Sequence, residues 1–294
     1  MMVRQPAVAG AFYAASPERC REHLEQLIPR DIDASILPAK VIGGIAPHAG
    51  WTFSGRVCGT VFAAIKARAS EGEPGTFVLF GTSHRRLRRS AALFAEGAWE
   101  TPLGLAHVDS RLAERVLGGT SLIEEDPYPH EDEHSIEVQV PFVQYLFPQA
   151  KILPILVEPS SWAVEIGQAV ARTVQISAAS VVYVGSTDLT HYGPNYGFLP
   201  EGLGQQGLAW AKDVNDRRLI ELMRLLKAED IVREVTEHRN ACGSGAIAAT
   251  LAACKLAGAQ QGVLLAHVSS HEVARSMQSH AGDDAVGYAG MVFG

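Results

Sequence analysis

Paired cysteines and long apolar runs are missing from the 294-residue sequence, and each absence narrows the class of protein. The cysteines stand alone at Cys20, Cys58, Cys242 and Cys254, and no two of them form a CxxC pair. This distribution argues against a structural zinc site and against a disulfide-stapled secreted domain. No apolar run approaches the ~18 residues that cross a bilayer, and the N-terminal MMVRQPAVAGAFY lacks the apolar stretch and cleavage site of a secretory signal. We therefore expect a reduced, cytoplasmic protein without a membrane segment.

An excess of positive charge is also absent. The chain has 25 Lys and Arg against 32 Asp and Glu, which gives a formal net charge of -7. Nothing in this balance compensates the phosphates of a nucleic acid or the headgroups of an anionic membrane, so neither is an expected partner. Hydrophobic residues make up 47% and charged residues 19%, as in a globular protein with a substantial core.

What the sequence does contain is an alternation of short apolar runs and helix-length segments. Continuous apolar runs indicate strands that are covered on both faces. Seven such runs are expected to be strands, at 41–46, 76–81, 91–96, 151–157, 180–186, 262–268 and 286–293. The order predicts an α/β fold with a mostly parallel or mixed central sheet and helices on both faces. The polar segment 120–133 is too short for an interdomain linker, so we expect a single domain over 1–294.

Three of the predicted strands end in a polar loop that carries a histidine. His48 follows 41–46, His84 follows 76–81, and Asp188 and His191 follow 180–186. The carboxyl ends of parallel strands form the edge where ligands bind, so these side chains are expected to share one site. The remaining histidines interpreted as structural or solvated are His23, His107, His238 and His280.

Imidazole groups at one edge suggest a metal. Imidazole suits iron, copper and zinc, and two histidines with one anionic ligand leave open positions on a ferrous ion. The sequence offers two candidates for the anionic ligand. Asp188 is three residues before His191, and Cys242 comes just before a predicted helix, where backbone N–H groups stabilise a thiolate. An isolated cysteine at a tight turn is also consistent with simple packing.

A second group of reactive residues lies in PHEDEHSIEVQVPF. His134 and Glu137 are three residues apart, so they would share one face of the helix predicted over 134–147. The acids before them suit the positive end of that helix. Arg85 and Arg86 follow His84 and are either solvated or attract an anionic substrate.

A glycine motif, GSGAIA at 243–248, resembles a dinucleotide fingerprint. The fingerprint requires a buried strand directly before it, and REVTEHRNAC is too polar to be one. We therefore do not expect NAD as a cofactor, and haem is not expected either.

Seven segments in order carry a family resemblance. AVAGAFYAAS, GGIAPHAGWTFSG, LFGTSH, WETPLG, DEHSIEVQVPF, GSTDLTHYG and ACGSGAI together resemble the Memo family, also called AmmeMemoRadiSam system protein B, from about residue 3 to the C-terminus. That family is similar in fold to the class III extradiol dioxygenases, which are non-haem iron enzymes. The resemblance implies a pocket formed by His48, His84 and Cys242, with Asp188 and His191 beside it.

The resemblance also implies a chemistry and partners. The carboxylate of the dioxygenases is replaced by Cys242, and a thiolate shifts metal preference toward copper or zinc. Family members are linked to iron or copper redox chemistry, and prokaryotic ones to an AMMECR-type protein and a radical SAM protein.

Three hypotheses follow. The first is a redox protein with Fe(II) or copper on His48, His84 and Cys242, acting on a small substrate. Asp188 and His191 would act as acid–base or orienting groups. The residues expected to support or wall the pocket are His134, Glu137, Phe12, Tyr13, Trp51, Tyr192 and Arg85. The second hypothesis is a non-enzymatic module that binds a small ligand or peptide in a degenerate metal pocket, and the third is a hydrolase with Cys242 as nucleophile.

Overall fold

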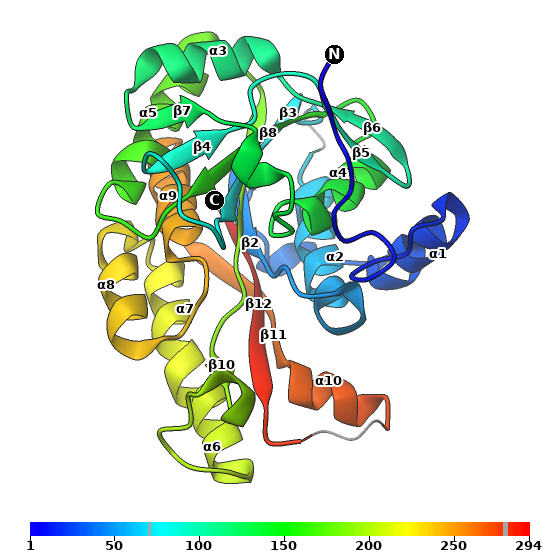
Figure 1. Ribbon diagram of the computed structural model, residues 1–294, viewed down its shortest axis with the longest axis vertical. Helices are drawn as coiled ribbons and strands as arrows, with labels where there is room; N and C mark the ends of the chain where they lie inside the picture. The colour runs from blue at the N-terminus through cyan, green and yellow to red at the C-terminus, as the bar shows by residue number, and fades with distance from the viewer. Residues whose placement is uncertain (70–71, 279–281) are drawn as a thin grey trace.

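A mixed β-sheet runs through the middle of the molecule (Figure 1). The computed structural model describes residues 1–69, 72–278 and 282–294. Within these residues the sheet has nine strands in the order β10-β12-β2-β9-β3-β8-β4-β7, with β11 paired to β12. Their bounds are β2 Gly43–Ala46, β3 Thr76–Thr82, β4 Ala91–Leu93, β7 Ile123–Glu125, β8 Lys151–Val157, β9 Val181–Ser186, β10 His191–Tyr192, β11 Gly262–Ser269 and β12 Ala285–Phe293.

The four central strands are parallel, and the strand next to them on each side runs antiparallel to them. Strands β2, β9, β3 and β8 pair in parallel, whereas β12 runs antiparallel to β2 and β4 runs antiparallel to β8. A smaller sheet joins β1 (Val3–Arg4), β5 (Ala98–Thr101) and β6 (Gly104–His107). The predicted α/β fold with a mixed sheet is therefore confirmed.

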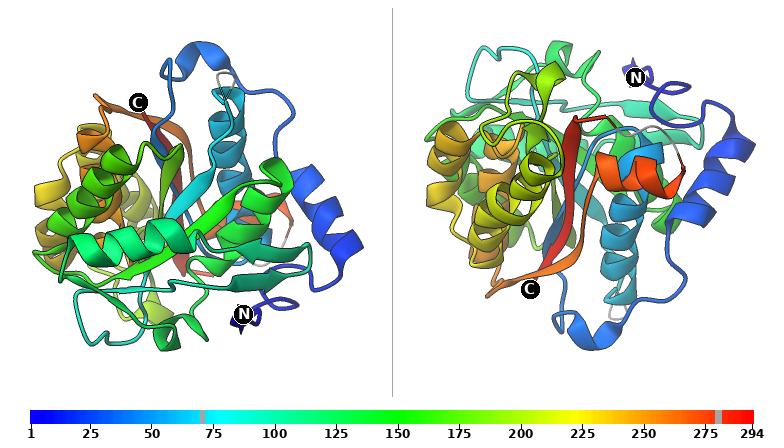
Figure 2. Two further views of the ribbon diagram at one scale, coloured as in Figure 1. Left: turned by 90° about the horizontal axis from the view of Figure 1, so that it is seen from above. Right: turned by 90° about the horizontal axis from the view of Figure 1, so that it is seen from below.

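Helices cover both faces of the sheet, as the two views of Figure 2 show. One face packs against α3 (Ser110–Gly119), α5 (Ala163–Ser177), α7 (Arg217–Arg224), α8 (Ala228–His238) and α9 (Ser244–Leu256). The other packs against α1 (Pro17–Leu27), α2 (Trp51–Ala67) and α4 (Val140–Leu146). At one end of the molecule lie α6 (Gln205–Trp210), which runs through a π-helical turn (Ala211–Asp216) into α7, and α10 (Ser270–Ser276).

The continuous apolar runs make this layering necessary. Along β3, Val78 and Phe80 enter one core, while Phe77 and Leu79 enter the other. Successive strand residues point to opposite faces, so a strand that is apolar at every position must be covered twice. None of the described helices combines the length and the apolarity needed to cross a bilayer.

The helix predicted over 134–147 is much shorter in the structure. Residues 137–139 form a 3-10 turn, and α4 begins only at Val140. Pro141 lies in the first turn of α4, where its missing N–H costs nothing, but its ring would clash with an α-helix that continued toward His134. His134 and Glu137 therefore do not share an α-helical face, and that prediction was wrong.

The segment 120–133 is also more ordered than its polarity indicates. It contains β7, which pairs in parallel with β4, and a 3-10 turn at Tyr128–His130. The hairpin β5–β6 and the helices α8 and α10 were not predicted. His280 lies outside the described residues.

Candidate metal centre

The carboxyl ends of three neighbouring parallel strands bring the candidate side chains together. Strands β2, β9 and β3 are adjacent, and they end at Ala46, Ser186 and Thr82. The loops that follow them carry His48, Asp188 and His84. A parallel pairing places all three loops at the same edge, as the sequence analysis expected.

Three histidines form the tightest group at this edge. One ligand atom from each of His48, His84 and His134 lies within 4.8 Å of the others. The ring centroids are 5.6 Å apart for His48 and His84, 5.3 Å for His48 and His134, and 4.8 Å for His84 and His134. His48 is buried, whereas the His84 side chain is 44% exposed, so the group is open to solvent on one side. His134 thus belongs to the group itself, although the sequence analysis assigned it a supporting role.

A chain of hydrogen bonds fixes the tautomer of His48. The Ser186 hydroxyl donates its proton to the Ser135 carbonyl at 2.5 Å, so toward His48 Nδ1, 3.0 Å away, it acts as an acceptor. His48 Nδ1 must therefore carry the proton, which leaves Nε2 with a free lone pair. Neutral imidazole with a free Nε2 is the form that binds metals.

A buried carboxylate holds the other two histidines. Both carboxylate oxygens of Glu133 lie 3.0 Å from His84 Nδ1, and Oε1 lies 3.5 Å from His134 Nδ1. The backbone N–H groups of His84 and Ser135 donate to the same carboxylate. Burial alone would raise the pKa of the Glu133 carboxyl, but these bonds lower it to about 2, so the group is ionised.

The histidines differ in their affinity for protons. Burial lowers the pKa of His48 to about 4, which Asp188 partly opposes, and burial also lowers the pKa of His134. The hydrogen bond to Glu133 raises the pKa of His84 above its ordinary value, against a smaller effect of burial. At neutral pH, His48 and His134 are therefore neutral imidazoles. His84 holds a proton more strongly, and that proton competes with a metal cation for the ring.

Cys242 lies beside this group. Its Sγ is 3.2 Å from His48 Nε2, and the Asp188 backbone N–H donates to the sulfur at 3.4 Å. Burial, followed by the negative charge of Asp188, raises the pKa of the Cys242 thiol to about 12. A thiolate stabilised by a helix N-terminus was expected from the sequence. In the metal-free protein the thiol form is favoured instead, because burial and the Asp188 charge outweigh the backbone donors.

Asp188 and His191 occupy different positions along one loop. The Asp188 carboxylate accepts the backbone N–H of His48 at 2.8 Å and is buried, so it fixes the loop that carries this histidine. His191 begins β10, where its Nδ1 lies 3.0 Å from the Leu189 carbonyl and its ring packs edge-on against Tyr196.

Glu137 supports the site from behind rather than facing it. Its carboxylate accepts bonds from the Arg4 guanidinium, the Tyr13 hydroxyl and the backbone N–H groups of Ala7 and Val8. These contacts tie the N-terminal segment to the loop that carries His134, because Arg4 also donates to the carbonyls at 130 and 133.

Of the aromatic side chains expected to wall the pocket, Phe12 lies against His134, whereas Tyr13 and Trp51 stack on each other in the core. The Phe12 ring meets the His134 ring edge-on at 5.0 Å, and Tyr13 stacks on Trp51 at 5.1 Å. The Trp51 indole donates to the Val138 carbonyl. Tyr192 packs elsewhere, in the cluster around α6, and Arg85 pairs with the exposed Asp132.

Two residues that organise the site, Ser186 and Glu133, were not predicted from the sequence. Ser186 ends β9, and Glu133 stands among five consecutive charged or ionisable residues, 130–134, so its partner could not be identified from the pattern. The signals were present, because Glu133 is adjacent to His134 and Ser186 is two residues before Asp188.

The donor set fits a transition metal. Three imidazole nitrogens converge, the proton of His48 is held on Nδ1, and a carboxylate stands behind His84 and His134. Metal-bound histidines commonly donate their other N–H to such a carboxylate or to a neutral acceptor. Imidazole ligands suit zinc, copper, iron and nickel, so the geometry supports a metal site without selecting the ion.

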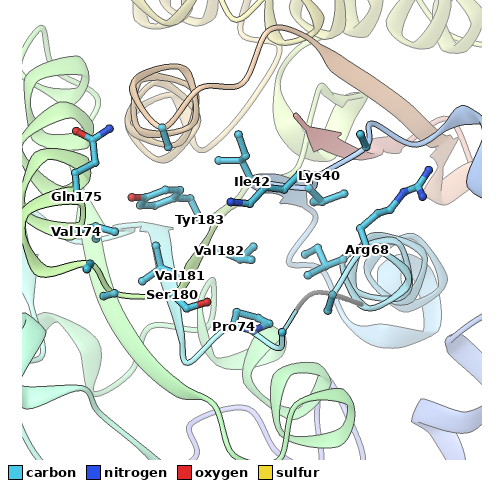
Figure 3. Close-up of a pocket in the computed structure, with 18 residues that line it drawn as sticks. Lys40, Ile42, Arg68, Pro74, Val174, Gln175, Ser180, Val181, Val182 and Tyr183 are labelled. Atoms are coloured by element: carbon cyan, nitrogen blue, oxygen red, sulfur yellow. The ribbon is translucent and has the colours of Figure 1, made fainter.

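A separate cavity of about 500 Å³ lies at the opposite edge of the sheet (Figure 3). Its lining includes the residues just after the C-terminal ends of α2 and α9, and the last turn of α5. Lys40 and Arg68 also line the cavity, and the Arg68 guanidinium donates to the carbonyls of Ala34 and Leu37. This cavity contains none of the candidate residues.

The fold and the histidine group define an α/β protein with a potential metal centre at the carboxyl edge of its sheet. The family model of the Memo-like proteins matches residues 4–292. The chain is similar to a MEMO1 family protein of Methanothermobacter thermautotrophicus, with 33% identity over 98% of this chain and 99% of the relative. It is also similar to one of Thermococcus onnurineus, with 35% identity over 99% of each chain. The chain belongs to the Memo family.

Among solved structures, the uncharacterized protein JW3007 of Escherichia coli K12 aligns with 76% of this chain and 89% of its own. The TM-score is 0.47 and the sequence identity is 11%.

Proposed function

We propose that this Memo-family protein is a metal-dependent redox protein that acts on a small substrate. The observation that carries the proposal is the convergence of ligand atoms from His48, His84 and His134 within 4.8 Å at the edge where α/β sheets bind ligands. Fe(II) or copper is the proposed ion, and when bound it would supply one-electron or dioxygen chemistry. The cytoplasm, where thiols stay reduced, is the proposed location, since all four cysteines are free.

The chain's own residues would prepare this site in distinct ways. Ser186 and Glu133 direct the Nδ1 protons of His48 and His84 away from the centre. Cys242 presents a thiol next to His48 Nε2, where it can donate or receive a proton or become a ligand after deprotonation. The exposed edge of His84 leaves an approach for a small molecule or a peptide, the proposed ligands.

The first test is the metal content of protein purified without oxygen. The wild type is expected to hold near-stoichiometric iron or copper, and His48→Ala is expected to lose it. His134→Ala and Cys242→Ser separate the two ligand sets, because a three-histidine site depends on His134 and a His48–His84–Cys242 site depends on Cys242. If the wild type takes up no transition metal, the proposal is wrong, and the alternative function, a non-enzymatic ligand-binding module, is favoured.

The 3.2 Å contact between Cys242 Sγ and His48 Nε2 supports a second candidate, a cysteine hydrolase with His48 as base. The raised pKa of the thiol argues against it as the first choice. Thiol alkylation that abolishes turnover while a chelator has no effect would favour the hydrolase. Association with AMMECR-type and radical SAM proteins remains a proposal from the resemblance, which co-purification would test.

A further inference from the structure

We propose that Glu133 is the positioning residue of the metal centre: its buried carboxylate fixes the tautomer and orientation of His84, and through a longer contact His134. The inference rests on the proposed metal function, since it concerns ligands of that site. In the metal-free protein, too, the Nδ1 proton of His84 is directed toward Glu133.

The geometry leaves the carboxylate little freedom. Glu133 is 4% exposed along its side chain. The backbone N–H of Ser135 donates to Oε1 at 2.8 Å, and that of His84 donates to Oε2 at 2.9 Å. Each oxygen is thus held by one fixed donor, and the plane of the carboxylate is set before either imidazole approaches.

An ionised carboxylate can only accept hydrogen bonds. The 3.0 Å contacts to His84 Nδ1 therefore require a proton on that nitrogen, and the neutral ring keeps its lone pair on Nε2. The 3.5 Å approach of Oε1 to His134 Nδ1 favours the same tautomer there. One carboxylate thereby leaves the lone pair on Nε2 in both His84 and His134, as Ser186 does for His48.

The two sides of the site are organised differently. His48 has a neutral acceptor, the hydroxyl of Ser186, whereas His84 and His134 share a charged one. A carboxylate increases the basicity of the imidazole that donates to it, and it compensates the charge of a bound cation. Removing its charge should therefore weaken cation binding even where the ring geometry survives.

A purely structural role is the alternative, because Glu133 also fixes two backbone N–H groups. Glu137 offers a matched control. It is also a buried glutamate, and its carboxylate contacts Arg4, Tyr13 and backbone N–H groups but no histidine side chain. Its substitution should disturb the fold, and it reaches the metal ligands only through the backbone of the loop that carries His134.

The experiment measures Co²⁺ affinity by competition titration for the full-length wild type, Glu133→Gln, Glu133→Asp and Glu137→Gln. Glu133→Gln is expected to lose ~10–100-fold in Co²⁺ affinity, the usual effect of removing such a partner. Glu133→Asp, which retains the charge, should recover part of the loss, and Glu137→Gln should lose much less affinity than Glu133→Gln despite a lower melting temperature. Wild-type affinity in a folded Glu133→Gln protein would overturn the inference.

A second measurement needs neither metal nor variant. Long-range ¹H–¹⁵N NMR of the metal-free wild type reports which ring nitrogen of His84 keeps its proton once the ring is neutral. A proton on Nδ1 is expected, and a proton on Nε2 would overturn the inference even if Glu133→Gln failed to fold. If the wild type and His48→Ala both fail to bind Co²⁺ while the Nδ1 tautomer is found, the metal function fails and the positioning of His84 stands.

Discussion

At the scale of single residues, His130 gives the sharpest prediction about pH. It is fully buried, its Nε2 lies 3.2 Å from the Ala92 carbonyl, and its ring meets Phe94 and Trp99 edge-on. Burial lowers the pKa of His130 to about 3, the Ala92 carbonyl opposes this, and the Arg4 charge adds to it. Between pH 6.5 and pH 3, His130 is therefore protonated in the unfolded chain, where its pKa is about 6.5, but stays neutral in the folded protein.

Stability from this residue is present above pH 6.5 and is lost as pH falls toward 3, by about 1.4 kcal/mol per pH unit. Between pH 7 and pH 5 the wild type should lose ~2 kcal/mol more unfolding free energy than His130→Gln. Urea unfolding of both proteins at the two pH values measures the difference, and the other titrating groups cancel. Equal pH dependence in the two proteins would show that His130 is protonated without cost.

The sequence predicted the location of a site residue correctly where that location follows from its place at the end of a strand. His48, His84 and Asp188 could be placed at one edge because each follows an apolar run. The pairings across the site could not be predicted, because the contacts of Glu133 with His84 and of Ser186 with His48 join residues 49 and 138 positions apart. Only the three-dimensional arrangement of the loops creates them.

At the scale of elements, the contact between α5 and α9 depends on a glycine. A Cβ built on Gly167 would lie 2.0 Å from the Ala249 carbonyl oxygen, so the two helices pack backbone to backbone there. In α3, Gly118 has no atom within 4 Å of its equivalent Cβ position. The same substitution should therefore have opposite effects at the two sites.

Gly167→Ala is expected to lower the unfolding free energy by ~1–3 kcal/mol, because overpacking exceeds the gain in helix propensity. Gly118→Ala is expected to leave it unchanged or raise it by up to ~1 kcal/mol. Urea denaturation of the three proteins measures both changes. A stabilised Gly167→Ala protein would mean that α5 and α9 separate at little cost.

Element-scale prediction failed mainly at irregular segments. The period of apolar residues identified the central strands, since each is buried on both faces. The same apolar period predicted an α-helix over 134–147, whereas α4 begins at Val140. The prediction did not take account of Pro141, which ends an α-helix on its N-terminal side. The apolar period also missed β7, whose three residues include two glutamates and owe their strand geometry to pairing with β4.

At the scale of the whole molecule, the strand order predicts which strands keep their backbone hydrogen bonds longest during local unfolding. Strands β9 and β3 have partners on both sides, whereas β7 pairs only with β4 among the described strands. In hydrogen exchange, amides of 77–80 and 182–185 should open only with global unfolding, which costs ~5–15 kcal/mol in typical domains, and those of 123–125 should exchange earlier. Hydrogen exchange followed by mass spectrometry tests this order. Equal protection in β7 and β3 would contradict it.

The sheet order itself was only partly predictable. Alternating strands and helices indicate a parallel centre, but they do not say that β12 inserts next to β2. That placement depends on the return path through α9 and β11, which no local pattern encodes.

The position of β12 has a consequence for synthesis of the chain. This strand follows every other described element, its nine residues are all buried, and it separates β11 from β2. A nascent chain leaves the ribosome N-terminus first, so the backbone N–H and C=O groups on one edge of β2 lack their β12 partners until 285–293 emerge. During that interval the loop bearing His48 follows a strand that is paired on one side at most. The exposed edge of β2 is then a surface that a chaperone would bind.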